Sequence, residues 1–82
     1  MNEAVKTRIE TIINENDVVL FMKGTAKIPQ CGFSSRVAGI LNYLQVNFKD
    51  VNVLEDEDIR QGIKDFSDWP TIPQLYVKNA FI

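Results

Sequence analysis

The spacing of apolar residues along the chain predicts three amphipathic helices. Apolar positions three and four residues apart share one face of a helix. This spacing occurs near the N-terminus, from about Gly32 to Gln45, and after the acidic run Glu55–Asp58, whose carboxylates favour a helix start by complementing the helix dipole. The apolar positions are Val5, Ile9, Ile12 and Ile13; Phe33, Val37, Ile40, Leu41 and Leu44; and Ile59, Ile63 and Phe66.

Four other segments have the pattern of strands. Residues Val18–Met22 are continuously apolar and rich in branched and aromatic side chains, which is typical of a central strand covered on both faces. Apolar and polar residues alternate over Phe48–Leu54 and over Gln74–Lys78. After a turn at Lys78–Asn79, Phe81–Ile82 begin a fourth strand.

The predicted order is helix, strand, helix, strand, helix, strand, turn, strand. A strand–helix–strand unit makes the first two strands parallel, with a right-handed crossover. The short turn makes the last two strands an antiparallel hairpin. The sequence therefore predicts an α/β domain over residues 1–82, with a mixed four-stranded sheet flanked by helices and no repeat, linker or low-complexity stretch.

Composition and charge exclude several classes of protein. The 82 residues are 45% apolar and 24% charged, which is typical of one globular domain. A net charge of −2 and a pI near 4.9 argue against a broad nucleic-acid-binding face. The longest apolar run, Val18–Met22, is too short for a membrane span, and Glu3, Lys6, Arg8 and Glu10 interrupt any signal peptide.

The chain has no histidine and one cysteine, Cys31. The lack of histidine excludes His-ligated zinc and His-dependent catalytic triads within the chain. A single cysteine forms no internal disulfide, which favours a reducing compartment. A bacterial cytoplasm fits a chain that starts at Met1 without a presequence, and the alternative is a mitochondrial matrix protein whose transit segment has been removed.

Cys31 is the main candidate for chemistry. It follows a strand and a loop and lies at the first turn of a predicted helix, where free N–H groups and the helix dipole favour a thiolate. Lys23, at the end of the preceding strand, adds positive charge nearby. A lone cysteine is usually buried and inert, but such cysteines tend to lie inside elements. Because Ser34 rather than a second cysteine follows at i+3, Cys31 needs an external thiol to resolve a mixed disulfide.

Three segments together resemble one known family. These are Lys23–Thr25, the Pro-Gln-Cys-Gly-Phe-Ser-Ser run Pro29–Ser35, and the Trp-Pro-Thr-Ile-Pro-Gln-Leu-Tyr-Val run Trp69–Val77. In this order and at these distances they resemble the monothiol glutaredoxins of the Cys-Gly-Phe-Ser class, through nearly the whole chain. The resemblance implies a thioredoxin-like (glutaredoxin) fold.

The resemblance also implies roles for individual residues. The Ile72–Pro73 peptide bond is expected to be cis, which places the backbone of Ile72 against the cysteinyl part of glutathione. Lys23 and Arg60 are expected to bind glutathione carboxylates, with Cys31 as the reactive thiol and the metal ligand.

On their own, several of these residues have plainer interpretations. Arg60 alone is typical of a solvated helix charge, and Pro73 alone of a trans turn proline. The acidic run lacks the spacing and glycine of a calcium loop. Phe33 and Trp69 are more often core or groove-lining residues than catalytic ones, and Phe33 belongs to the apolar stripe of its helix.

The family pattern normally continues with a Gly-Gly pair, a small residue or cysteine, an aspartate and a final helix. Those glycine and aspartate positions hold the glutamyl end of glutathione in the family, and they are not among these 82 residues. The glutathione site is therefore expected to be incomplete within residues 1–82.

Counting ligands favours cluster binding. A [2Fe–2S] cluster takes about four ligands, ordinarily thiolates. Two chains supply two through Cys31, and two glutathione thiols complete the set, which matches the family's glutathione-ligated cluster in a homodimer. The resemblance thus implies iron–sulfur transfer to apo-protein recipients, with a BolA-like protein as a possible replacement for one subunit.

Two other functions stay open. One is an enzyme, a glutathione-dependent thiol–disulfide oxidoreductase that removes glutathione from proteins through Cys31. The other is an adaptor that uses the fold only for protein contact. The Gly24–Gln30 loop favours the carrier, because monothiol members have this loop and the resemblance associates it with poor oxidoreductase activity.

Overall fold

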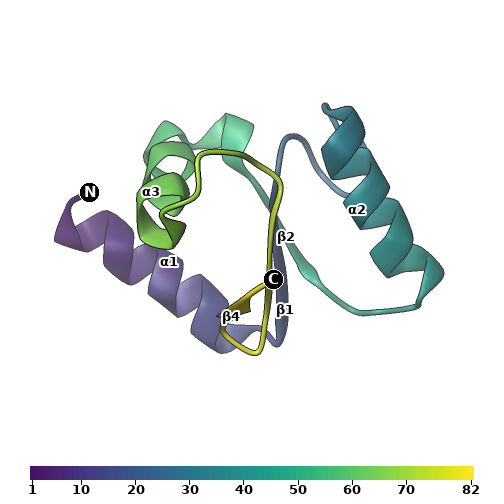
Figure 1. The fold of residues 1–82 in the computed structure, drawn as a ribbon, viewed down its shortest axis with the longest axis horizontal. Coiled ribbons are helices and arrows are strands. Elements are labelled where there is room, and N and C mark those ends of the chain that lie inside the picture. The colour runs from purple at the N-terminus through teal and green to yellow at the C-terminus, as the bar shows by residue number, and fades with distance from the viewer.

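The computed structural model describes all of residues 1–82 and contains a four-stranded sheet with helices on both faces (Figure 1). Helices and strands follow one another in the predicted order. They are α1 (Glu3–Glu15), β1 (Val18–Met22), α2 (Gly32–Tyr43), β2 (Lys49–Asn52), the 3₁₀ turn η1 (Val53–Glu55), α3 (Glu57–Ser67), β3 (Gln74–Val77) and β4 (Ala80–Phe81).

The sheet has the order β2-β1-β3-β4 and is mixed, as predicted. Strand β1 pairs with β2 in parallel, with Leu20 opposite Asp50 and Met22 opposite Asn52. It pairs with β3 antiparallel, and β3 pairs antiparallel with β4. The all-apolar β1 is therefore a central strand, and its residues from position 19 to 22 are fully buried.

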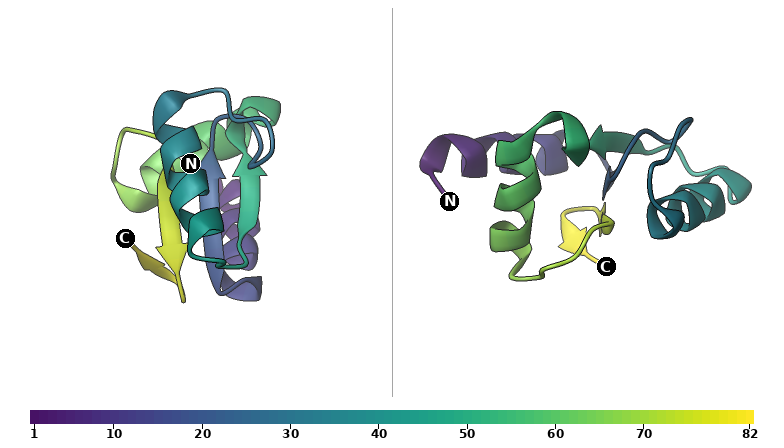
Figure 2. Two further views of the ribbon diagram at one scale, coloured as in Figure 1. Left: turned by 90° about the vertical axis from the view of Figure 1, so that its right-hand side faces the viewer. Right: turned by 90° about the horizontal axis from the view of Figure 1, so that it is seen from above.

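The helices lie on the two sheet faces unequally. Figure 2 shows α2 alone on one face, with α1 and α3 together on the other. Ten buried residues make the core between the sheet and the helix pair: Val5, Ile9, Ile13, Val19, Phe21, Val53, Ile59, Ile63, Ile72 and Tyr76. Four make the core under α2: Leu20, Met22, Ala38 and Leu41. The predicted apolar stripes of the first and third helices are confirmed.

The predicted apolar stripe of the second helix is wrong in part: Leu41 is buried and Val37 packs against the same core, but the other three positions face outward. Phe33, Ile40 and Leu44 are exposed, and the buried positions of α2 are Ser34, Ala38 and Leu41. This buried set still has helical spacing, but two of its members are small. Small residues on that side allow the helix axis to lie close to the sheet, which turns the larger apolar side chains outward.

Two predicted element ends differ from the structure by two residues, and the predicted strand bounds elsewhere differ by one. The alternating pattern predicts a strand over Phe48–Leu54, but β2 ends at Asn52 and the chain turns into η1. The Asn52 side chain accepts a hydrogen bond from the Leu54 amide (3.0 Å), which favours this turn. Helix α2 ends at Tyr43 rather than Gln45, where the backbone has a positive φ of 59°.

Candidate functional site

Cys31 caps the start of α2 at the end of the loop that follows β1. Its backbone is extended (φ −151°), and its carbonyl accepts the Ser35 amide at 2.9 Å as the first hydrogen bond of the helix. The side chain is partly exposed and forms no disulfide. The structure therefore presents the thiol to solvent at a helix N-terminus, as predicted, and not inside the core.

The surroundings of Cys31 favour the thiolate. The backbone N–H of Ser34 and, next, that of Phe33 lower the pKa of the Cys31 thiol below its ordinary value. The Ser34 hydroxyl and the Lys23 ammonium act more weakly in the same direction. A lowered thiol pKa increases the thiolate fraction near neutral pH, and the thiolate is both the nucleophile and the metal ligand.

Ser34 occupies the place where a two-cysteine motif has its second thiol. Its side chain is fully buried, and its Oγ accepts the backbone N–H of Lys23 at 3.1 Å. This bond joins the end of β1 to the first turn of α2. Ser34 thus fixes the two segments that carry Lys23 and Cys31, and it supplies no second sulfur.

A cavity of about 620 Å³ opens beside the thiol. Its lining comes from the end of β1, the first two turns of α2, the last turn of α3 and the loop before β3. The lining residues are Lys23, Cys31, Phe33, Arg36, Val37, Lys64, Pro70, Thr71, Ile72 and Pro73. Three of these are cationic and none is acidic, so the cavity favours an anionic ligand.

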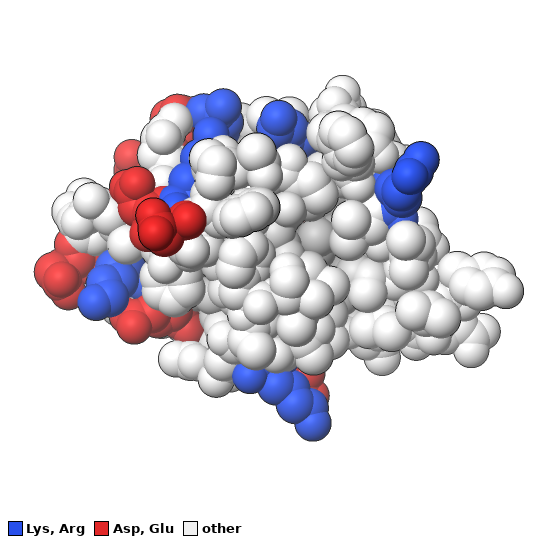
Figure 3. All heavy atoms as spheres, viewed as in Figure 1, with Lys and Arg blue, Asp and Glu red and all other residues white.

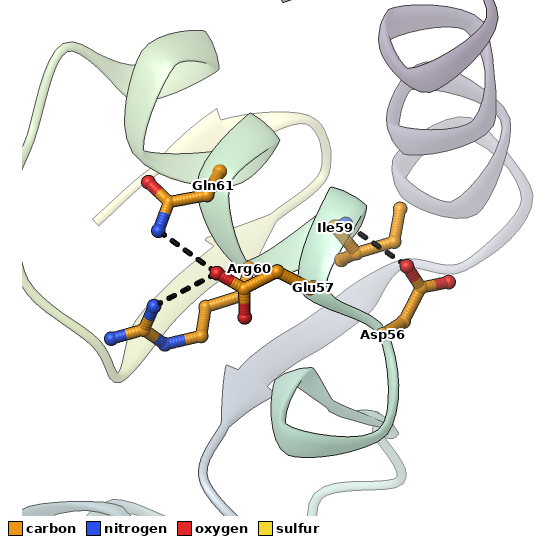
Figure 4. Close-up of polar contacts among 5 residues, drawn as sticks. All are labelled: Asp56, Glu57, Ile59, Arg60 and Gln61. Carbon is orange, nitrogen blue, oxygen red and sulfur yellow. Dashed lines mark hydrogen bonds and ion pairs between the residues drawn. The ribbon is translucent and has the colours of Figure 1, made fainter.

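Three of the four site residues expected from sequence meet in this cavity: Lys23, Cys31 and Ile72. Arg60 is not among the lining residues. Its guanidinium pairs with Glu57 one turn earlier on α3, at 3.3 Å, and the same carboxylate oxygen accepts the Gln61 amide at 3.1 Å (Figure 4). The roles of all four residues stay predictions.

Arg36 and Lys64 line the cavity but are missing from the sequence-based site. Lys64 follows Arg60 by four residues, so both lie along one side of α3, and this spacing is the signal that could have pointed to Lys64. Nothing in the sequence pattern distinguishes Arg36. Phe33 lines the cavity with 74% of its surface exposed, which agrees with the groove-lining interpretation rather than the core one.

The buried Gln74 side chain holds the loop before β3 through hydrogen bonds. The Ile72–Pro73 peptide bond is cis, as expected from the resemblance. Gln74 is buried, and its Nε2 donates to the carbonyls of Trp69 and Thr71, both at 3.2 Å. Its Oε1 accepts the hydroxyl of Tyr76 at 3.1 Å. These bonds fix the loop just before the segment that lines the cavity and at Thr71 within that segment.

Comparison with known families matches residues 18–82 to the glutaredoxin family. The chain belongs to the glutaredoxin family. It is 52% identical over 82 residues to a ycf64-like monothiol glutaredoxin of Synechocystis, which covers 100% of this chain and 77% of that protein. It is 53% identical over 77 residues to the chloroplastic monothiol glutaredoxin-S14 of Arabidopsis thaliana, which covers 94% of this chain and 44% of that protein.

Solved glutaredoxin structures have the same fold. Reduced apo GrxS14 of poplar matches with a TM-score of 0.80 at 51% identity, covering 94% of this chain and 71% of that one. A buckwheat glutaredoxin in complex with glutathione matches with a TM-score of 0.84 over 100% of this chain and 76% of that one. At 20% identity the second likeness shows the fold alone. The predicted monothiol glutaredoxin membership and thioredoxin-like fold are confirmed.

Charge is distributed unevenly over this glutaredoxin. Most of the acidic side chains visible in Figure 3 gather over α1 and α3, away from α2. No group of three or more His, Cys, Asp or Glu side chains is arranged to hold a metal ion.

No helix has the length and apolar character needed to cross a bilayer. Family membership assigns the general thiol redox chemistry of glutaredoxins, with glutathione as the small thiol.

Proposed function

We propose that this glutaredoxin binds glutathione in the Cys31 cavity and carries a glutathione-ligated [2Fe–2S] cluster for delivery to other proteins. The observation that carries the proposal is a partly exposed thiol, with a lowered pKa, at the rim of a cavity lined by three cations and no acid. Glutathione has two carboxylates and one ammonium, so this lining suits its net negative charge.

Each residue has a part in holding the tripeptide. The Ile72 backbone pairs with the cysteinyl unit, and the Lys23 ammonium binds a carboxylate. Arg60 pairs with Glu57 through one guanidinium nitrogen; because the Glu57 side chain is largely exposed, this ion pair is weak and does not prevent Arg60 from binding a carboxylate. Lys64 already lies in the cavity lining and adds positive charge there.

Ligand supply favours a cluster shared by two chains. Each chain offers one thiolate, Cys31, and no group of side chains that could hold a metal by itself. Two Cys31 thiolates and two glutathione thiolates make the four ligands that such a cluster takes. The cluster is cargo here: apo iron–sulfur proteins are the proposed recipients, and a BolA-like protein is a proposed substitute for one of the two chains.

Anaerobic reconstitution tests the carrier function. With iron, sulfide and glutathione, the protein should become coloured and dimeric in size-exclusion chromatography. Cys31→Ser should abolish both properties, since it removes the only thiol in the chain. Ser35→Ala, one helical turn away and exposed, is the matched control and should reconstitute fully. A coloured dimer from Cys31→Ser would refute the proposal.

The lowered pKa of Cys31 also favours a second candidate, removal of glutathione from proteins. The Cys31 thiolate would attack the glutathione sulfur of a mixed disulfide and release the protein thiolate. A second glutathione thiolate would then attack the Cys31–glutathione disulfide, forming glutathione disulfide and restoring the Cys31 thiolate. Fast, Cys31-dependent turnover without cluster formation would favour this enzyme over the carrier.

A further inference from the structure

The segment from Lys23 to Gln30, here called the thiol loop, is closed on itself. The Gln30 amide donates to the Lys23 carbonyl at 2.9 Å, so the two ends of the loop are joined. Inside it, the Ile28 amide donates to Thr25 Oγ1 at 3.0 Å. Gly24 has φ +86°, and a Cβ there would lie 2.5 Å from the Ile28 carbonyl oxygen. The loop therefore closes tightly over Gly24.

Two side chains of β2 hold this loop from outside. Asn52 Oδ1 accepts the Gly24 amide at 2.9 Å, and Asp50 Oδ2 accepts the Ala26 amide at 2.8 Å. Asp50 and Asn52 are two residues apart on β2, so their side chains lie on the same face of the sheet. Neither residue lines the Cys31 cavity.

We propose that Asp50 and Asn52 are positioning residues for the glutathione site. The inference rests on the proposed function, because the groups they position are the proposed ligands of glutathione. Lys23 begins the thiol loop and Cys31 directly follows its last residue. Hydrogen bonds from the Gly24 and Ala26 amides to β2 therefore fix the two ends of the loop, and with them the cavity-lining residues Lys23 and Cys31, relative to the sheet.

Without the two acceptors, the Gly24 and Ala26 amides would bond to water and the loop would populate other conformations. Glutathione would then bind only the fraction of molecules with the loop in place, which lowers the apparent affinity. Loss of one such hydrogen bond is expected to weaken glutathione binding about 3- to 10-fold. Both residues bond to the loop backbone and not to the cavity lining. Asn52 Oδ1 also accepts the Leu54 amide, so Asp50 is the position at which the loop bond alone is removed.

The test compares substitutions that remove the acceptor with ones that keep it. Asp50→Ala and Asn52→Ala remove the oxygens, whereas Asp50→Asn and Asn52→Asp retain one in the same place. Asn47→Ala is a control, since Asn47 is an exposed asparagine just before β2 whose side chain bonds to nothing. The measurements are the dissociation constant for glutathione, the NMR amide signals of Lys23 and Cys31, and amide hydrogen exchange at Gly24 and Ala26.

The proposal expects that the alanine variants exchange faster at Gly24 or Ala26, shift the Lys23 and Cys31 signals, and bind glutathione about 3- to 10-fold more weakly. The acceptor-keeping variants and Asn47→Ala should match the original protein in all three. Faster exchange with unchanged Lys23 and Cys31 signals would overturn it. If the original protein does not bind glutathione, the proposed function fails. The NMR amide signals of Lys23 and Cys31 then decide the positioning role: shifted signals in the alanine variants support it, and unchanged signals overturn it.

Discussion

The two faces of the sheet differ in how the helices are held. Against α1 and α3 the sheet buries a core of ten residues, and against α2 it buries a core of four. The proposed reactive thiol belongs to the thinner side, because Cys31 starts α2, although Lys64 of α3 and Ile72 also line the cavity beside it. Stability is thus concentrated on one face of the molecule and the reactive thiol on the other.

Polar bonds at the end of β1 compensate for the thin packing of α2. The Ser34 hydroxyl accepts the Lys23 amide, and Asn52 accepts the Gly24 amide, both next to the site. Apolar burial is not directional, whereas hydrogen bonds fix distances and angles. The thicker face therefore mainly supplies free energy of folding, while the thinner face depends on directed contacts for the position of Cys31.

The largest expected effect on stability concerns the close packing of the thicker side, which two helix glycines test, Gly62 buried in α3 and Gly39 exposed in α2. Gly62 of α3 faces α1, and a Cβ there would lie 2.5 Å from Val5 Cγ1 and 3.1 Å from Ile9 Cδ1. Gly62→Ala should therefore lower the free energy of unfolding, because overpacking costs about 1–3 kcal/mol and the gain in helix propensity returns at most about 1 kcal/mol.

Gly39 of α2 is the control position: it is exposed, and a Cβ there would meet nothing within 4 Å. Gly39→Ala should raise the free energy of unfolding by about 0.5–1 kcal/mol through helix propensity alone. Urea unfolding of both variants measures the contrast. If the two substitutions change stability in the same direction, close packing of Gly62 between α3 and α1 is not what controls the effect.

The two tyrosines give the next contrast. Tyr76 lies in the thicker core and donates to Gln74, and burial raises the pKa of its hydroxyl, which keeps the donor proton in place. Tyr76→Phe leaves the buried Gln74 oxygen without a partner, which should lower the free energy of unfolding by about 1–3 kcal/mol.

Tyr43→Phe is the control, because Tyr43 is an exposed residue of α2 and should change stability by less than about 0.5 kcal/mol.

Since Gln74 also holds the Trp69 and Thr71 carbonyls, Tyr76→Phe should weaken glutathione binding as well. Unchanged affinity would mean that the loop before β3 is fixed without this hydrogen bond.

The sequence predicted the fold well where periodicity reports burial. The continuous apolar run of β1 and the stripes of α1 and α3 reflect the thicker core directly. The stripe of α2 misled because Ser34 and Ala38, which face the sheet, are small or polar, whereas Phe33 and Ile40 face outward. A hydrophobic pattern cannot reveal that a helix packs through its small residues.

The site was predictable only in part. Cys31, Lys23 and Ile72 lie in short motifs, so the resemblance to a family is enough to group them in one site. The anchors of the thiol loop could not be found in this way, because Asn52 and Asp50 bond to amides 28 and 24 residues away. Such contacts exist only once β1 and β2 are paired, and local patterns carry no trace of them.

The smallest expected effect concerns the surface of the thicker side, where Arg8 of α1 meets Asp56, the N-cap of α3. The Arg8 side-chain hydrogen bond, and next the Ile59 amide, lower the pKa of the Asp56 carboxyl. A lowered pKa in the folded state stabilises the protein above the unfolded pKa of about 3.9. This contribution is lost as the pH falls through the lower, folded pKa.

Asp56→Asn isolates the charge, because its Oδ1 still accepts the Ile59 amide that Asp56 caps at 3.2 Å. At pH 7 this variant should be less stable than the original protein by up to about 1 kcal/mol, since both partners are partly exposed. The difference should shrink below about pH 4 and vanish in stronger acid, where the carboxyl is protonated in both states. In an Arg8→Met background most of the difference should already be absent at pH 7, as a double-mutant cycle of urea unfolding would measure.

A stability difference that persists at low pH would show that the side-chain amide of the Asp56→Asn variant caps α3 poorly and that the lost charge is not responsible. The ion pair would then add nothing to the thicker side beyond its apolar core.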